Sequence, residues 1–207
     1  MAHAGASATW EQMWSRGLGK GQAFDVGAPS ATLLGELART PYAPRRGMSA
    51  LVPGCGRAYD ALALAQHGFD SVLAVDIAPT GVEAARAELA ASGDPAASKV
   101  EIRMADFFGL EGQFDLVWDC TFLCALDPSV RQRWATKQRQ LLAPGGTLLT
   151  CVFPICEKAG GPPFAMSTEL VRGLLEPAGL EAAAVRDPLP PAEQHAPGGA
   201  GSLGTST

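Results

Sequence analysis

A glycine turn between a short apolar run and a helical stretch constrains the fold of this chain more than any other feature. The string Val52-Pro53-Gly54-Cys55-Gly56-Arg57 closes the apolar run 48–52, and the next apolar run, 71–75, is followed by Asp76. Glycines let the backbone turn sharply and approach a ligand, and a carboxylate at a strand end can accept hydrogen bonds from ribose hydroxyls. This order of strand, turn, helix, strand and acid predicts a nucleotide-binding βαβ unit.

The same turn argues against a dinucleotide cofactor. A dinucleotide fingerprint needs a third glycine near position 59, and this chain has Tyr59 there. The sequence also lacks a Tyr-x-x-x-Lys string that could serve hydride transfer. A nicotinamide oxidoreductase is therefore a disfavoured alternative. Thermal stabilisation of the protein by NAD would support it.

Composition narrows the class of protein. The chain has 207 residues, of which 47% are hydrophobic, and this size suits one globular domain with one substantial core. The net charge is −5 and the Lys and Arg residues are scattered, which argues against a nucleic-acid partner. No apolar stretch approaches the roughly 20 residues of a membrane span. We expect a cytoplasmic protein that does not associate with a membrane.

Cysteine and histidine give little sign of chemistry. The five cysteines are odd in number and lack C-x-x-C spacing, so neither a disulfide framework nor a metal site is expected. Cys55 and Cys120 have no base partner that the sequence identifies, which favours packing over a nucleophilic role. His195 and the two other histidines are isolated from acidic clusters, so we expect no histidine general base.

Strand and helix patterns alternate along most of the chain. Strands are predicted at 48–52, 71–75, 100–104, 114–118, 147–153 and 180–185. Helices are predicted at 9–16, 31–39, 58–67, 80–91, 129–142 and 167–176. This alternation predicts an α/β fold with a doubly wound, mostly parallel sheet of the seven-stranded type, in which the last strand can be degenerate. We expect one domain, 1–207, with N-terminal lid helices (1–47), a core (48–186) and a loosely ordered tail (187–207).

Candidate functional residues follow four successive strands. Gly54, Asp76, the pair Asp106-Phe107 and the pair Asp119-Cys120 come directly after the first, second, third and fourth predicted strands. Ligands of open parallel sheets bind outside the carboxyl ends of the strands. The four strand ends are therefore expected to converge on one crevice.

Several longer strings carry a family resemblance over roughly residues 10 to 186. They are Trp10-Glu11-Gln12-Met13-Trp14, the glycine string with Val75-Asp76-Ile77, Asp106-Phe107-Phe108, Phe114-Asp115-Leu116-Val117-Trp118-Asp119, Phe122-Leu123-Cys124-Ala125-Leu126 and Gly160-Gly161-Pro162-Pro163-Phe164. With these strings the chain resembles the class I S-adenosylmethionine-dependent methyltransferases, and more closely the thiopurine, thiol, thiocyanate and halide methyltransferase superfamily. The resemblance implies a Rossmann-like fold and S-adenosylmethionine as cofactor.

The resemblance also implies roles for single residues in holding the cofactor. Gly54 is expected to lie against its methionine portion, Asp76 to take the ribose hydroxyls, and Asp106 with Phe107 to hold the adenine. Trp10 and Trp14 would form a helical lid whose faces could attract the sulfonium, although their spacing alone would equally suit core packing. Phe24 is expected as the third aromatic residue of this segment.

Two positions depart from the relatives, and no catalytic residue is assigned. Cys120 occupies the cofactor-binding position of a tyrosine, and Phe164 occupies the position of another tyrosine on the substrate side. Arg131 and Arg133 are expected on a solvated helix face, without a chemical role.

The expected activity is methyl transfer to a small soft nucleophile: a thiol, hydrosulfide, thiocyanate or a halide. The expected partner is this small molecule and the expected state is a monomer, although no motif sets the oligomeric state. Because Cys120, Phe24, Phe164 and the degenerate tail depart from the family pattern, the alternative is a homologue that binds the cofactor but has weak catalytic activity.

Overall fold

The chain divides into two compact units in the computed structural model, which describes residues 3–39, 46–195 and 201–206. Unit 1 comprises residues 1–29 and 42–110, and unit 2 comprises residues 30–41 and 111–207. Parts of the predicted lid (1–2 and 40–45) and of the predicted tail (196–200 and 207) lie outside the described residues. The expectation of one domain stays a prediction.

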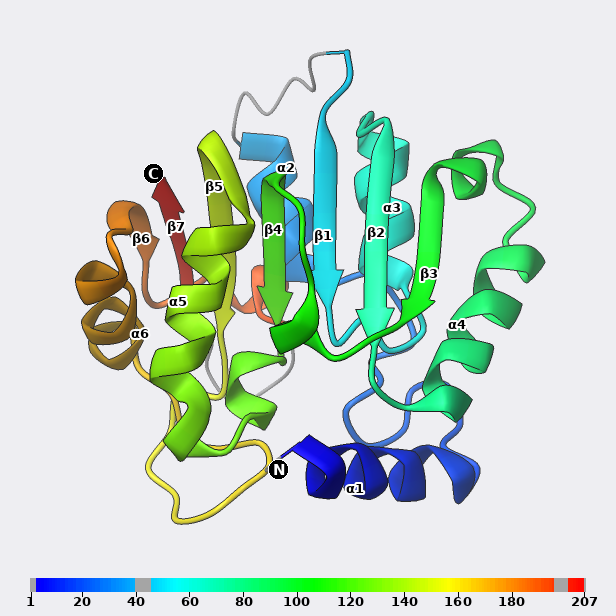
Figure 1. Ribbon diagram of the computed structural model, residues 1–207, viewed down its shortest axis with the longest axis horizontal. Coiled ribbons are helices and arrows are strands. Elements are labelled where there is room, and N and C mark those ends of the chain that lie inside the picture. Colours follow the sequence, from blue (N-terminus) through cyan, green and yellow to red (C-terminus); the bar gives the residue numbers. More distant parts are fainter. Residues whose placement is uncertain (1–2, 40–45, 196–200, 207) are drawn as a thin grey trace. The chain divides into compact units, whose positions relative to one another are not determined.

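Unit 1 is built on three parallel strands with helices between them. The strands are β1 (Ser49–Pro53), β2 (Ser71–Asp76) and β3 (Val100–Met104), and β2 pairs with both neighbours. The helical segments are α1 (His3–Ser15), α3 (Tyr59–His67), α4 (Pro79–Ala91), η1 (Pro95–Lys99) and η2 (Phe107–Gly109). In Figure 1, α1 lies beyond the arrowheads of β1 and β2, at their carboxyl ends.

The local sequence explains where these elements begin and end. Residues 72–75 of β2 are all buried, because its side chains are apolar on both faces as in a covered parallel sheet. Helix α3 ends at His67, and the next residue, Gly68, adopts a left-handed conformation with φ 118° that glycine adopts at low cost. Helix α4 begins with Pro79, whose missing N–H is not needed in a first turn.

Among its described residues, unit 2 contains four strands, of which three run in the same direction and one runs in the opposite direction. The strands are β4 (Phe114–Cys120), β5 (Leu142–Val152), β6 (Glu181–Arg186) and β7 (Gly201–Ser206). The pair β4 and β5 is parallel, and β7 lies antiparallel between β5 and β6. The helices are α2 (Ala31–Arg39), α5 (Arg131–Leu141) and α6 (Thr168–Leu175), with short helical turns η3 (Leu123–Ala125), η4 (Pro128–Val130), η5 (Glu176–Ala178) and η6 (Pro191–Glu193).

The tail differs from the sequence expectation. Instead of being loosely ordered throughout, residues 201–206 form β7, with Leu203 opposite Thr150 of β5 and Val185 of β6. Strand pairing uses backbone N–H and C=O groups, which a Gly- and Ser-rich segment possesses like any other. A strand inserted between two others can therefore form without the alternation of apolar residues that a sequence pattern requires.

Two further element boundaries differ. Helix α1 begins at His3, six residues before the predicted start at Thr9. Strand β5 begins at Leu142, so that Pro144, Gly145 and Gly146 lie within it instead of separating it from α5. The register of β4 and β5 shifts between Phe114 and Leu116, and this irregularity accommodates the extra residues of β5.

Candidate functional site

Asp76 lies at the centre of the polar contacts at the carboxyl end of β2. Its Oδ2 accepts the backbone N–H of Gly56 (3.2 Å), and its Oδ1 accepts that of Ala78 (3.0 Å). Burial raises the pKa of Asp76, while these backbone donors act in the opposite direction. Each carboxylate oxygen can accept a second hydrogen bond. These two hydrogen bonds orient the Asp76 side chain. The acceptor capacity that remains on its oxygens suits a diol such as ribose.

The glycine turn after β1 has the conformation that its sequence predicts. Gly54 and Gly56 have φ values of 59° and 53°, a region that residues with a Cβ seldom adopt. Cys55 between them donates its N–H to Val75 O (2.9 Å), which ties the turn to β2. Burial raises the pKa of the Cys55 thiol well above its ordinary value, so Cys55 is not an activated nucleophile.

Three aromatic residues predicted for the cofactor site come together in unit 1. The ring centroids of Trp10 and Trp14 lie 5.6 Å and 5.7 Å from that of Phe24, both in edge-on geometry. Trp14 is buried, and the guanidinium of Arg57 lies 5.5 Å from the centre of its ring. Trp14 therefore makes a cation–π contact with Arg57, whereas the family resemblance implies such a contact with the sulfonium of the cofactor.

Helix α1 is fixed to the start of α4 by polar contacts that the sequence analysis missed. Glu11 accepts the backbone N–H of Thr80 (2.9 Å) and also the Thr80 hydroxyl, and Ser7 Oγ donates to Ile77 O (3.4 Å). A carboxylate satisfies the free N–H groups of a helix N-terminus and interacts favourably with its dipole. No local pattern indicates this role, because 69 residues separate Glu11 from Thr80.

Asp106 and Phe107 follow β3 next to Asp76. Asp106 Oδ1 accepts the N–H of Phe108 (2.9 Å), which caps η2, and Phe107 is buried. The N–H of Ala105 donates to the backbone oxygen of Asp76 (3.0 Å). Unit 1 therefore brings together every predicted cofactor residue except Cys120.

Cys120 and Phe164 lie in unit 2. Cys120 is the last residue of β4 and is buried. The N–H of Phe164 donates to Cys124 O (2.7 Å), which ties the Gly-Gly-Pro-Pro-Phe segment to η3. Asp119 stabilises the loop after β4. Its carboxylate accepts hydrogen bonds from the backbone N–H of Leu123 (3.1 Å) and from the indole N–H of Trp134 (2.7 Å).

Arg131 is buried, in contrast to the solvated position expected from its helix. Its exposed fraction is 9%, and its guanidinium lies 5.4 Å from the centre of the Phe164 ring. Within the described residues, its Nε and Nη2 atoms have no hydrogen-bond partner. Burial lowers the pKa of Arg131. Arg133, two residues along α5, is exposed as predicted.

His195 is a further residue of unit 2 that the sequence analysis set aside. Its Nδ1 lies 3.4 Å from Cys120 Sγ and 3.2 Å from Ser30 Oγ. Its ring lies edge-on to Phe153, which follows β5, with centroids 5.6 Å apart. Because 165 residues separate His195 from Ser30, sequence spacing contains no signal for this cluster.

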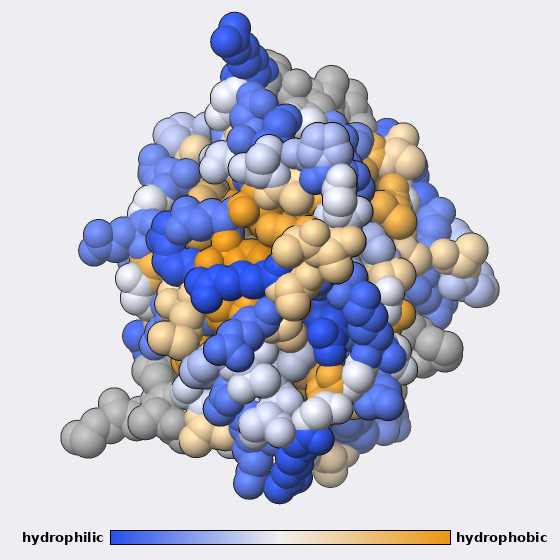
Figure 2. All heavy atoms as spheres, turned by 90° about the vertical axis from the view of Figure 1, so that its right-hand side faces the viewer, coloured by the Kyte–Doolittle hydropathy of each residue, from blue (hydrophilic) through white to orange (hydrophobic). Residues whose placement is uncertain are grey.

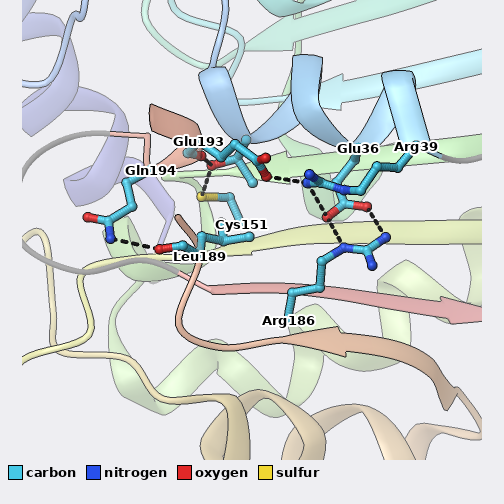
Figure 3. A network of polar contacts seen from close by, with 8 residues as sticks. Glu36, Arg39, Cys151, Arg186, Leu189, Glu193 and Gln194 are labelled. Carbon is cyan, nitrogen blue, oxygen red and sulfur yellow. Dashed lines mark hydrogen bonds and ion pairs between the residues drawn. The ribbon is translucent and has the colours of Figure 1, made fainter. Parts of the chain in front are cut away.

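An ion-pair network holds the segment before His195 against α2 (Figure 3). Arg186 donates to both carboxylate oxygens of Glu36 (2.8 and 2.9 Å), and Arg39 pairs with both Glu36 and Glu193. The Thr32 hydroxyl donates to Glu193 O (2.8 Å). Glu193 is thus bound through its side chain and its backbone, two residues before His195.

The chain matches the sequence model described as thiopurine S-methyltransferase (TPMT) over residues 5–202. The chain belongs to the thiopurine S-methyltransferase family. A probable thiol methyltransferase 2 of Arabidopsis thaliana is 39% identical over 184 residues, which cover 88% of this chain and 77% of that protein. Thiocyanate methyltransferase 1 of Brassica oleracea is 31% identical over 86% of this chain and 76% of its own length.

Solved structures confirm the fold of this family member. The N-methyltransferase NodS of Bradyrhizobium japonicum, in complex with S-adenosyl-L-homocysteine, aligns over 95% of this chain and 97% of its own, with a TM-score of 0.71 and 17% identity. Magnesium protoporphyrin IX methyltransferase of Synechocystis aligns over 97% of this chain and 94% of its own, with a TM-score of 0.70 and 18% identity. The predicted doubly wound, mostly parallel, Rossmann-like α/β class is therefore correct.

As a member of the thiopurine S-methyltransferase family, the chain is an S-adenosylmethionine-dependent methyltransferase. The residues of unit 1 fit this methyl donor, because the glycine turn exposes backbone beside the fixed Asp76 carboxylate. Among the described residues there is no cluster of three or more metal-ligating side chains, and no helix is long and apolar enough to span a bilayer.

The family member also has an apolar hollow that contains none of the predicted site residues. It has a volume of about 320 Å³ and is lined by Arg86, Leu89, Ala90, Ala97, Val100 and Ile102. Figure 2 views the molecule from the side of α4 and β3, and hydrophobic residues gather on this face beneath a rim of hydrophilic ones.

Proposed function

We propose that this enzyme transfers the methyl group of S-adenosylmethionine to a small soft nucleophile: a thiol, hydrosulfide, thiocyanate or a halide. The observation that carries the proposal is the buried guanidinium of Arg131 over the Phe164 ring, with two nitrogen atoms that lack a hydrogen-bond partner among the described residues. A desolvated cation beside an apolar ring suits a soft anion, which is itself weakly hydrated. The relatives named thiol and thiocyanate methyltransferases support the same substrate class.

The proposal assigns the residues of unit 1 to the methyl donor. Asp76 would take the ribose hydroxyls, the backbone at Gly54 the methionine portion, and Asp106 with Phe107 the adenine. Trp10, Trp14 and Phe24 would cover the donor, held in place by the contacts of Glu11 with α4. From the family resemblance we assign Cys120 to cofactor binding and Phe164 to substrate binding, at positions where relatives carry tyrosines.

The proposed chemistry is a direct displacement, for which S-adenosylmethionine provides the activated methyl group when it is bound. The enzyme contributes position, and a well-oriented pair of reactants gains an effective molarity of up to about 10⁵–10⁸ M. Exclusion of water by the buried residues around Phe164 and Arg131 strengthens the electrostatic interactions of an anionic nucleophile. An anion of this kind reacts without losing a proton.

The setting we propose is the cytoplasm, with the enzyme acting as a monomer on small molecules and not on nucleic acid. The net charge of −5 argues against a nucleic-acid partner, because nucleic-acid binding requires clustered positive charge. Light scattering of the purified protein tests the monomer directly, and a stable dimer would contradict it.

The substrate class is tested with a panel of acceptors at saturating S-adenosylmethionine. Thiocyanate, iodide, hydrosulfide and 2-mercaptoethanol are compared with glycine, an amine acceptor, by mass spectrometry of the methylated products. The proposal predicts methylation of at least one sulfur or halide nucleophile and none of the amine. If S-adenosylhomocysteine binds but no acceptor is methylated, the protein is the catalytically weak homologue.

A further inference from the structure

Strand β3 forms an open edge of the sheet in unit 1. Among the described residues it pairs with β2 on one side, and no strand pairs with its other side. The N–H of Ala105 donates to Asp76 O, so the residues at odd positions of β3 face β2. Successive residues of a strand direct their N–H and C=O groups to opposite sides, so Val100, Ile102 and Met104 present theirs to the open edge. An edge of this kind can pair with a strand of another chain.

A side chain of α4 occupies the middle of this edge. Arg86 Nη2 donates to Ile102 O (3.2 Å), at the central residue of β3. Arg86 is exposed, so its positive charge lies where another strand would approach. A strand that pairs with this edge must displace the guanidinium from the carbonyl oxygen of Ile102.

The residues of β3 match those of a second copy of the same strand. In an antiparallel pair centred on Ile102, Glu101 lies opposite Arg103 of the second copy. In the same register Val100 lies opposite Met104, which is 57% exposed in this structure. Opposite charges and apolar side chains in such cross-strand positions stabilise pairing. The order Val-Glu-Ile-Arg-Met is therefore complementary to itself.

The apolar hollow of unit 1 lies along the same edge. Its lining includes Val100 and Ile102 of β3, Leu89 and Ala90 of α4, and Arg86. Figure 2 shows hydrophobic residues gathered on this face. A second copy that pairs with β3 would bring its own hollow alongside this one, and the burial of apolar surface would add to strand pairing.

We propose that Arg86 blocks the pairing of β3 with β3 of a second copy of this chain. In such a pair both Arg86 side chains would have to leave the Ile102 carbonyl oxygens. They would also lie close together at the centre of the pair, where like charges repel. Removal of Arg86 therefore opens a surface whose partner is the chain itself. This inference concerns assembly and does not depend on methyl transfer.

Sedimentation velocity over a series of protein concentrations tests the proposal. Arg86→Ala is compared with wild type and with Arg172→Ala, which removes an exposed arginine of α6. Arg86→Ala is expected to raise the association constant of the dimer at least about 10-fold, because two hydrogen bonds to Ile102 O no longer have to break. Arg172→Ala should match wild type. A monomeric Arg86→Ala protein, or a wild type that dimerises equally, would overturn the proposal.

Charge variants in the Arg86→Ala background test the register of the pair. Glu101→Arg places arginines opposite each other and should dissociate the dimer, whereas Glu101→Arg combined with Arg103→Glu should restore it. Dimerisation should also slow the exchange of the amide hydrogens of Ile102 and Met104. A dimer that Glu101→Arg leaves intact would use another surface and would overturn the proposal. If Arg86→Ala folds poorly, Arg86→Met retains an aliphatic stem without the donor and takes its place in every test.

Discussion

Under the proposed function, we expect cofactor binding to depend most on Asp76. Asp76→Asn preserves the size of the side chain but replaces one acceptor oxygen by a donor, which opposes the N–H of either Gly56 or Ala78. A hydrogen bond to a charged group contributes about 1.5–3 kcal/mol, so we expect S-adenosylhomocysteine affinity to fall about 10- to 100-fold. Isothermal titration calorimetry measures the change. Glu83→Gln removes an exposed carboxylate of α4 as the charge control, and equal effects of the two variants would contradict the assignment.

A second prediction for a single residue concerns Asp119 and the dependence of folding stability on pH. Burial raises its pKa to about 6, against the hydrogen bonds from Leu123, Trp134 and Gln138. A raised pKa means that the folded state binds the proton more tightly than the unfolded state, so folding loses stability as the pH rises from about 4 to above 6. The loss is about 3 kcal/mol at most.

Asp119→Asn removes the titratable carboxyl group. The substitution also removes one acceptor oxygen, and this loss lowers the free energy of unfolding by the same amount at every pH. The free energy of unfolding of wild type minus that of Asp119→Asn should therefore decrease between pH 4 and pH 7. Urea unfolding at several pH values measures this difference. A difference that stays constant, or increases, over this range would show that Asp119 is not held with a raised pKa.

At the scale of elements, the junction of α2 with β6 depends on Glu36. Glu36→Gln leaves Arg186 and Arg39 without their buried carboxylate, and loss of one member of a buried pair costs up to about 3–5 kcal/mol. Because the Arg186 side chain is 35% exposed, we expect about 1–3 kcal/mol, below that range. Glu176→Gln disrupts the exposed pair with Arg172 on α6 and should cost at most about 0.5 kcal/mol in thermal unfolding.

The packing of α1 on α4 depends on a glycine. A Cβ added to Gly81 would lie 2.9 Å from Trp14 Nε1, so Gly81→Ala should displace α1 and lower the melting temperature. In a Trp14→Ala background the same change should cost nothing, because alanine stabilises a helix interior by about 0.5–1 kcal/mol relative to glycine. Gly173→Ala in α6, where nothing lies within 4 Å, is the stabilising control. A similar destabilisation in both backgrounds would exclude contact with Trp14 as the cause.

At the scale of the whole molecule, the features of the fold and of the site that can be predicted from the sequence are those that depend on local residue patterns. The glycine turn and Asp76 follow buried strands that apolar runs mark, and Asp106 follows β3, in which apolar and charged residues alternate. The family strings extend this to the aromatic residues of α1 and to Phe24. These strands lie side by side in register, which places the residues after them at one edge of unit 1.

Other features depend on contacts between distant segments, and no local pattern contains them. Glu11 caps a helix 69 residues away, and His195 meets Ser30 across 165 residues. Arg131 is expected on a solvated helix face, but it lies in the first turn of α5 with its guanidinium 5.4 Å from the centre of the Phe164 ring. Strand β7 depends on backbone pairing with β5 and β6, which residue types do not reveal.

A single-turnover experiment with a labelled methyl group tests whether the chain methylates soft nucleophiles. The enzyme, in excess over S-adenosylmethionine carrying a deuterated methyl group, is mixed with thiocyanate, and the label is followed by mass spectrometry. If the chain is a methyltransferase for soft nucleophiles, the label appears in methyl thiocyanate with one equivalent of S-adenosylhomocysteine. The opposite result would be that the label stays in S-adenosylmethionine bound to the folded enzyme, first with thiocyanate and then with hydrosulfide as the acceptor. The chain would then not be a methyltransferase for soft nucleophiles.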